Sequence, residues 1–238
     1  MYGWRGRIGL IIPSSNTTME SEFWRMVPEG VSVHTTRLKL LRVAINELKE
    51  MAKNALHAAE LLATANVDVI VYGCTSGALI GGIEWEENLR KSIEEHVRIP
   101  TITTAFAVVN ALRELGVRKI SVATPYIDEV NVLEKKFLES NGFKVIKIKG
   151  LGIADNIEIG KQPPWTTYRL VREVNSSEAE AIFISCTNFR TIEVISKLEE
   201  DLGKPVISSN TASLWASLRI LGVKQRVKGY GKLLETRL

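Results

Sequence analysis

One pattern occurs twice in this chain, and it limits the folds that the chain can adopt. Residues 67–76, VDVIVYGCTS, form an apolar and β-branched run that ends at Cys-Thr-Ser. Residues 180–188, EAIFISCTN, repeat this run and end at Cys-Thr-Asn. Such runs are typical of buried strands in parallel sheets. Because Cys74 and Cys186 are the only two cysteines, we infer that they occupy equivalent positions in two similar halves.

The rest of the chain supports this duplication. The offset of 112 residues between the two cysteines, or a slightly shorter one, also relates three other pairs of segments: 8–13 with 120–125, 31–33 with 143–145, and 99–103 with 204–208. Strand patterns alternate with amphipathic helical patterns throughout, which indicates parallel sheets with helices on both faces. The predicted fold is therefore α/β, with two pseudo-symmetric Rossmann-like lobes.

The expected elements follow from hydrophobic periodicity. We expect strands at 7–13, 31–36, 67–73, 99–103, 119–124, 143–149, 180–185 and 205–208. We expect helices at 17–27, 45–65, 83–96, 105–115, 129–141, 163–175, 190–202 and 211–221. We expect the chain to cross back after the second half, so that the first lobe comprises 1–104 and 209–238 and the second lobe comprises 105–208.

Composition excludes several classes of protein. The 238 residues are 45% hydrophobic and 24% charged, and no apolar run approaches the roughly 20 residues that span a bilayer. The N-terminal segment lacks the apolar core of a signal peptide, so we expect a cytoplasmic protein without a membrane partner. The net charge is +4, but Lys and Arg alternate with Glu, which is typical of a solvated surface and not of a nucleic-acid site.

No cofactor or metal is expected. His34, His57 and His96 show no metal-ligand spacing, and in the cytoplasm two cysteines stay reduced. The glycine-rich segment 77–82 lacks the Lys-Ser/Thr of a phosphate loop and the spacing of a dinucleotide fingerprint. We therefore expect it to be a flexible lid or a loop of close approach.

The two cysteines are the centre of the predicted site. In open α/β sheets, ligands bind at the carboxyl ends of the strands, where both thiols and the loops 13–18 and 124–128 lie. A helix beginning after each cysteine would lower its pKa through backbone N–H groups and the helix dipole. Buried free cysteines are often only packing residues, but the duplication favours chemistry.

Hydrogen-bond donors accompany the thiols and are suited to a substrate carboxylate. Asn156 is included because residues 150–160 interrupt the repeat, and such loops often carry function; the alternative is that Asn156 caps a helix. The candidate binding residues are Asn16, Thr75, Ser76, Tyr126, Asn156, Thr187 and Asn188.

The paired cysteines in a duplicated α/β chain resemble the aspartate/glutamate racemase superfamily, whose members act on small carboxylates without a cofactor. Within it, the segments PSSNTTME at 13–20, TPY at 124–126 and DNIEIG at 155–160 resemble maleate cis-trans isomerase. That resemblance implies that Cys74 and Cys186 are catalytic and that Asn16, Tyr126 and Asn156 bind the substrate.

A second resemblance covers nearly the whole chain. Residues 123–131, 204–209 and 229–233 are similar to arylmalonate decarboxylase, which has glycine where this chain has Cys74 and keeps the thiol that matches Cys186. Its carboxylate-holding residues match Thr75, Ser76 and Tyr126.

Four hypotheses follow from these patterns and from what the two resemblances imply. The first is an isomerase of a small dicarboxylate, maleate to fumarate, with Cys74 as nucleophile and Cys186 as acid/base. A racemase would use both thiols as opposed bases, and a decarboxylase would need only Cys186. The non-enzymatic alternative is a two-lobe protein that binds a carboxylate. In each case we expect a small-molecule partner and a homo-oligomer.

Overall fold

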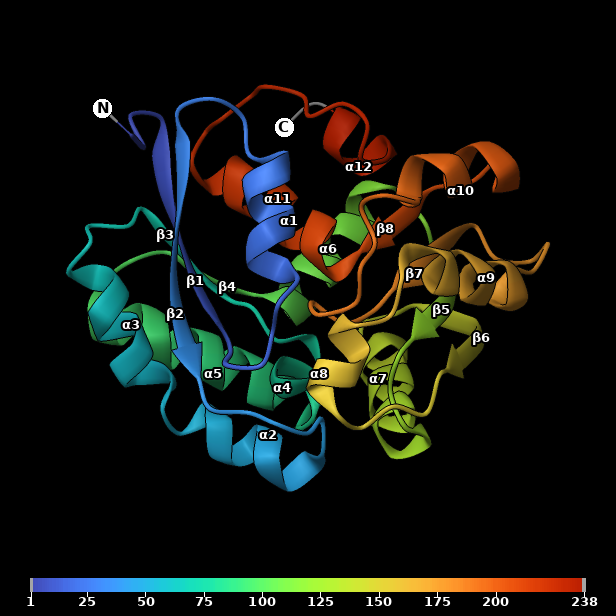
Figure 1. Ribbon diagram of the computed structural model, residues 1–238, viewed down its shortest axis with the longest axis horizontal. Helices are drawn as coiled ribbons and strands as arrows, with labels where there is room; N and C mark the ends of the chain where they lie inside the picture. Colours follow the sequence, from blue (N-terminus) through green and yellow to red (C-terminus); the bar gives the residue numbers. More distant parts are fainter. Residues whose placement is uncertain (1, 237–238) are drawn as a thin grey trace.

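The strands form two separate parallel sheets. The computed structural model describes residues 2–236. The strands of the first sheet are β1 (Gly6–Pro13), β2 (Val31–Leu38), β3 (Val69–Tyr72) and β4 (Thr101–Thr103), and those of the second are β5 (Lys119–Thr124), β6 (Lys144–Gly150), β7 (Ala181–Ile184) and β8 (Val206–Ser208). Their orders, β2-β1-β3-β4 and β6-β5-β7-β8, are equivalent. The duplicated α/β fold predicted from the sequence is therefore confirmed (Figure 1).

The two strands that lead to the cysteines lie inside their sheets. β3 pairs with β1 and β4, and β7 pairs with β5 and β8. Every residue of β3 and of β7 is buried, as expected for parallel strands that are covered on both faces. Each run therefore places its cysteine at the carboxyl edge of its sheet, directly after a fully buried strand.

Helices cover the sheets and fill the space between them. They are α1 (Met19–Met26), α2 (Ile45–Ala52), α3 (Ala55–Ala63), α4 (Thr75–Leu79), α5 (Gly82–Val97), α6 (Thr104–Glu114), α7 (Asp128–Ser140), α8 (Asn156–Gly160), α9 (Pro164–Val174), α10 (Ile195–Leu202), α11 (Ser209–Ile220) and α12 (Lys232–Glu235). Figure 1 shows α6 and α11 in the middle of the molecule. Across the described part of the chain, no helix combines the length and apolar character that a bilayer span requires.

Helix α11 joins the two halves. It packs on α6 and touches β3 and β4 of the first sheet and β8 of the second. Its first ten residues are all buried, including five polar ones, and a capping box of Ser208 and Thr211 starts it. The assignment of residues 209–238 to the first lobe stays a prediction, because these contacts reach both sheets.

Two expected helices have different bounds. The helix predicted at 45–65 is divided into α2 and α3 at Lys53 and Asn54, where the Asn54 side chain bonds to the Glu50 carbonyl instead of continuing the helix. The helix predicted at 190–202 begins only at Ile195. The buried Glu22 carboxylate accepts hydrogen bonds from the backbone N–H groups of Thr191 and Ile192. These bonds hold residues 190–194 outside the helix.

The glycine-rich segment is not an open lid. Its first part lies in α4, whose five residues are all buried. A Cβ atom at Gly77 would lie only 3.1 Å from the Cys74 sulfur, so a larger residue there would push against the thiol. Of the two expectations for residues 77–82, a loop in close contact with its neighbours fits the structure, and a flexible lid does not.

Candidate active site

Both cysteines lie where the repeat predicts. Cys74 is two residues beyond β3 and is the N-cap of α4, and Cys186 is two residues beyond β7. Both are free thiols and each is only 5% exposed. The two positions are equivalent in two equivalent sheets, so the duplication places one thiol at the carboxyl edge of each.

The backbone at Cys186 is strained. Its φ of 90° lies in the left-handed region, which residues with a Cβ atom rarely adopt and which costs on the order of 1–3 kcal/mol. The segment is held there by the bond from the Ser185 N–H to the Ala123 carbonyl. Strain of this kind is frequent at functional positions, where the structure fixes the direction of one side chain.

The thiol of Cys74 is close to two donors. The Gly77 N–H and the Ser76 hydroxyl, 3.8 Å from the sulfur, both lower its pKa. Burial nevertheless raises the pKa of Cys74 above its ordinary value. The prediction that the helix N-terminus brings this pKa below its ordinary value is therefore wrong, because removing a thiolate from water outweighs the hydrogen bond from the short α4 helix.

The thiol of Cys186 is perturbed more strongly. Burial raises its pKa to about 12, against hydrogen bonds from Tyr126 and from the Asn188 N–H that lower it. No helix begins directly after it, since α10 starts only at Ile195, so the expected helix dipole is absent at this position. At neutral pH Cys186 therefore carries its proton and is suited to donate it.

The two thiols are close enough to influence each other. A charge on Cys74 raises the pKa of Cys186, and charges on either thiol raise the pKa of Tyr126. Tyr126 is itself buried and follows β5. The thiols and the phenol thus interact electrostatically with one another. They lie where the loops after β1, β3, β5 and β7 meet, a region called the seam below.

Hydrogen bonds across the seam join the loops that the sequence singled out. The Asn16 amide donates to the Thr187 hydroxyl at 2.9 Å, and this hydroxyl donates to the Gly73 carbonyl at 3.0 Å. The Thr75 hydroxyl donates to the Ser209 hydroxyl at 2.8 Å. These bonds connect the Cys74 loop with the Cys186 loop and with the start of α11.

The Asn188 side chain connects three backbone groups of other segments. Its Oδ1 accepts from the Thr17 N–H at 2.9 Å, and its Nδ2 donates to the Asn156 carbonyl at 2.6 Å and to the Ser15 carbonyl at 3.4 Å. The Asn156 side chain in turn donates to the Ser15 hydroxyl at 2.8 Å. Asn188 therefore has no side-chain group free for a substrate, whereas Asn156 and Asn16 each use only one of two amide protons.

All nine candidate residues are buried at this seam, but sequence reasoning missed Glu22 and Asn210. The Glu22 carboxylate accepts from the Asn210 amide at 2.7 Å, and that amide also donates to the Thr187 carbonyl at 3.1 Å. Burial raises the pKa of Glu22 to about 7. A signal was present, because Glu22 shares the apolar face of its helix with Met19 and Met26, where a carboxyl group is unexpected.

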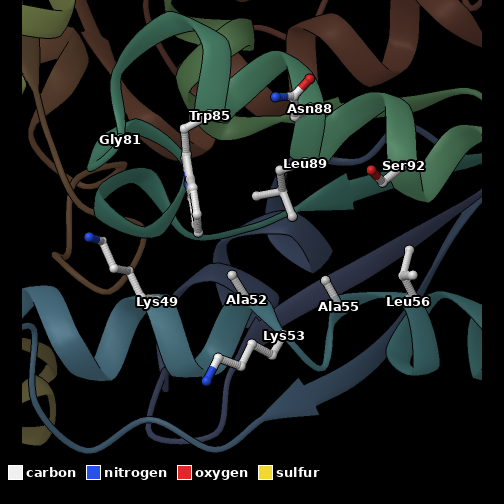
Figure 2. A pocket seen from close by; sticks show the side chains of 10 residues that line it. All are labelled: Lys49, Ala52, Lys53, Ala55, Leu56, Gly81, Trp85, Asn88, Leu89 and Ser92. Carbon is white, nitrogen blue, oxygen red and sulfur yellow. The ribbon is translucent and has the colours of Figure 1, made fainter.

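A surface groove lies outside this site. It has a volume of about 570 Å³ between α2–α3 and α5, and Figure 2 shows Trp85 and Leu89 directed into it, with Lys49 and Lys53 at its border. The indole N–H of Trp85 donates to the Gly77 carbonyl at 3.0 Å. The groove therefore adjoins α4, the helix that follows Cys74. Within residues 2–236, no group of three or more His, Cys, Asp or Glu side chains is placed to hold a metal ion.

Known proteins match nearly the whole chain. The family model for arylmalonate decarboxylase matches residues 8–234. The maleate isomerase of Geobacillus stearothermophilus is 31% identical over 242 residues, 96% of each chain. The arylmalonate decarboxylase of Bordetella bronchiseptica is 28% identical over 231 residues, again 96% of each.

A solved structure is similar along its entire length. It is a cysteine-to-serine mutant of the Nocardia farcinica maleate cis-trans isomerase with a covalently bound succinylcysteine intermediate. The TM-score is 0.94 at 28% identity, and the match covers 98% of this chain and 99% of that one. Both sheets, both thiols and the seam between them fall inside these matches. The chain therefore belongs to the arylmalonate decarboxylase family, and it is an enzyme.

Proposed function

We propose that the enzyme is a cis-trans isomerase of a small unsaturated dicarboxylate, converting maleate to fumarate. The observation that carries the proposal is the pair of free, buried and electrostatically coupled thiols at equivalent strand ends. A decarboxylase that protonates one face of a carbanion needs a single thiol. The relatives support the same reading, since the one from Geobacillus stearothermophilus is a maleate isomerase and one similar structure carries a succinylcysteine.

The reaction can be written with balanced steps. The Cys74 thiolate adds to one alkene carbon, and the electron pair of the double bond moves toward the carboxylate of the other carbon. Cys186 gives its proton to that second carbon, which leaves a succinyl thioether on Cys74. Rotation about the new C–C single bond follows. Cys186 then removes a proton from the same carbon as the C–S bond breaks, and the trans alkene leaves.

The polar residues divide this work. Asn16 and Asn156 each keep one amide proton for a substrate carboxylate, and Tyr126 provides a phenol beside both thiols. Thr75, Ser76, Thr187 and the Asn188 backbone shape the two thiol loops. Charge-assisted hydrogen bonds of this kind are stronger than neutral ones, so two carboxylates can compensate for their burial.

The direct test is proton NMR of the purified enzyme with maleate in deuterated water. Fumarate should accumulate. Cys74→Ser should abolish turnover, because a hydroxyl is far less ionised than a thiol. Cys186→Ser should retain some turnover, since proton transfer contributes about a hundred- to ten-thousand-fold. Trp165→Phe, a substitution on an exposed side chain, serves as the control and should leave the rate unchanged.

An arylmalonate decarboxylase is the second candidate, favoured by the family model that matches residues 8–234. Arylmalonate in the same NMR assay distinguishes the two reactions. If Cys74→Ser keeps near-normal activity while Cys186→Ser is inactive, the single-thiol decarboxylase is the better description. A chain that only binds carboxylates would turn over neither substrate. The cytoplasmic location and the homo-oligomeric state stay predictions, to be checked by cell fractionation and light scattering.

A further inference from the structure

The Tyr72 hydroxyl is a buried polar group without a partner beside one thiol. Tyr72 is the last residue of β3 and its side chain is 0% exposed. Within residues 2–236, its Oη atom makes no hydrogen bond. Buried tyrosine hydroxyls usually have a hydrogen-bond partner, and an unpaired one destabilises the folded state. If this side chain were needed only for packing, phenylalanine would fill the position equally well.

The position of the hydroxyl points to Cys74. A Cβ atom on Gly77 would lie 3.1 Å from the Cys74 Sγ and 3.2 Å from the Tyr72 Oη. The sulfur and the hydroxyl therefore border the same small space, which glycine leaves open. The two groups also interact electrostatically, because a charge on Cys74 raises the pKa of Tyr72.

We propose that Tyr72 is a positioning residue for Cys74, whose hydroxyl donates a hydrogen bond to the sulfur when the thiol ionises. It would be the third donor, after the Gly77 N–H and the Ser76 hydroxyl. The proposal requires the sulfur to move toward the hydroxyl across the space beside Gly77, with no covalent bond changed and with the proton retained on oxygen. The inference rests on the proposed function only in requiring Cys74 to act as a thiolate.

The physical reason is that burial alone disfavours the ionised thiol. An ionised acceptor forms a stronger hydrogen bond than a neutral one, so a donor without another partner favours the thiolate. Burial raises the pKa of Tyr72 well above its ordinary value, which keeps the hydroxyl protonated and able to donate. The other titratable groups coupled to Cys74 are Tyr126 and Cys186, and any test has to hold them constant.

The test is an NMR titration of Cys74 in a Cys186→Ser background, where Cys74 is the only cysteine. The Cβ shift of isotope-labelled cysteine reports its ionisation without a substrate and without access for a reagent. Adding Tyr72→Phe should raise the pKa of Cys74 by about one unit, which is about tenfold less thiolate at a given pH. Tyr168→Phe removes a hydroxyl that bonds to Asp201 on the second lobe, and it should leave the pKa of Cys74 unchanged.

The folded state gives a second readout. Tyr72→Phe removes a hydroxyl that has no partner, so its thermal unfolding temperature should be unchanged or higher. With Cys186 present, the variant should lower kcat for maleate more than it raises KM and move the acidic limb of the pH–rate profile to higher pH.

Two results would overturn the inference. One is an unchanged pKa of Cys74 in the Tyr72→Phe variant. The other is a lower unfolding temperature, which would show that the hydroxyl has a structural partner when the thiol is neutral. The titration is independent of the substrate, so a chain that shows the expected shift but does not isomerise maleate would refute the proposed function and leave this inference standing.

Discussion

The stability of this enzyme should fall as the pH rises from about 5 to 8, and the largest share of the fall should come from one carboxyl group in α7. Glu134 is 0% exposed, and neither carboxyl oxygen has a hydrogen-bond partner among the described residues. Burial raises its pKa from 4.5 to about 8, and the nearby Ser185 hydroxyl lowers it only in part. The folded protein therefore holds a proton that the unfolded chain has already lost.

The sign and the size of this change in the free energy of unfolding follow from proton linkage. The contribution of Glu134 to stability is fully present below the unfolded pKa of 4.5 and is lost as the pH rises through about 8. Each pKa unit corresponds to 1.36 kcal/mol, so the change between pH 5 and pH 8 is roughly 3 to 4 kcal/mol. That is a large share of the roughly 5–15 kcal/mol by which folded proteins are stable.

The assay is urea unfolding at several pH values between 5 and 8. Glu134→Gln removes the titration and keeps the shape, so the loss of stability across this range should be smaller than in the wild type by roughly 3 kcal/mol. Any constant cost of an unpaired amide cancels in this comparison, as does the titration of Glu22. Glu139→Gln, on an exposed position of the same helix, should follow the wild type. Parallel curves for Glu134→Gln and the wild type would refute the argument.

Two further predictions concern the thiol loops. Cys186→Gly should be more stable to urea than Cys186→Ala by about 1 kcal/mol, because only glycine tolerates the φ of 90° without strain; the usual order, with alanine more stable, would contradict the left-handed backbone. Gly77→Ala places a methyl group 3.1 Å from both the Cys74 sulfur and the Met51 methyl, so kcat should fall at least about tenfold through displacement of the thiol. A normal kcat would show that the loop can move without effect.

The repeat made the position of the site predictable. Parallel sheets bring the carboxyl ends of their strands to one edge, so two cysteines that end equivalent strands had to lie at equivalent edges. The same reasoning placed Asn16 and Tyr126, which follow β1 and β5. These inferences need only strand order and side-chain period, both of which are visible in local sequence.

The thiol pKa values could not be predicted in the same way. Local sequence shows a cysteine between a strand and a helix, which favours the thiolate. The direction of the pKa shift of Cys74 is instead set by burial, in a space that its sulfur shares with Gly77, Met51 and Tyr72. Such packing depends on elements that the chain brings together from a distance, and α2 was itself predicted with the wrong end. Desolvation is a property of the tertiary fold and has no local signal.

The same limit explains why Asn188 was assigned to the substrate. Next to a thiol and after a strand, an asparagine has the sequence context of a ligand donor, and only its partners, Thr17, Ser15 and Asn156, show that its amide is already used. These partners are separated from it by 32 to 173 residues.

The seam between the lobes is therefore held near the thiols by hydrogen bonds and not by apolar contact alone. Asn188 fixes the first-lobe loop to α8, and Glu22 fixes α1 to the Cys186 loop and to α11. Hydrogen bonds have a defined length and direction, so they set the spacing of the two thiols more narrowly than packed methyl groups would. A reaction that needs one sulfur on a carbon and a proton from the other requires this constraint, since a displacement of about 1 Å can cost a hundredfold in rate. Asn188, which the sequence assigned to the substrate, and Glu22, which sequence reasoning missed, thus keep the two halves of the site in register.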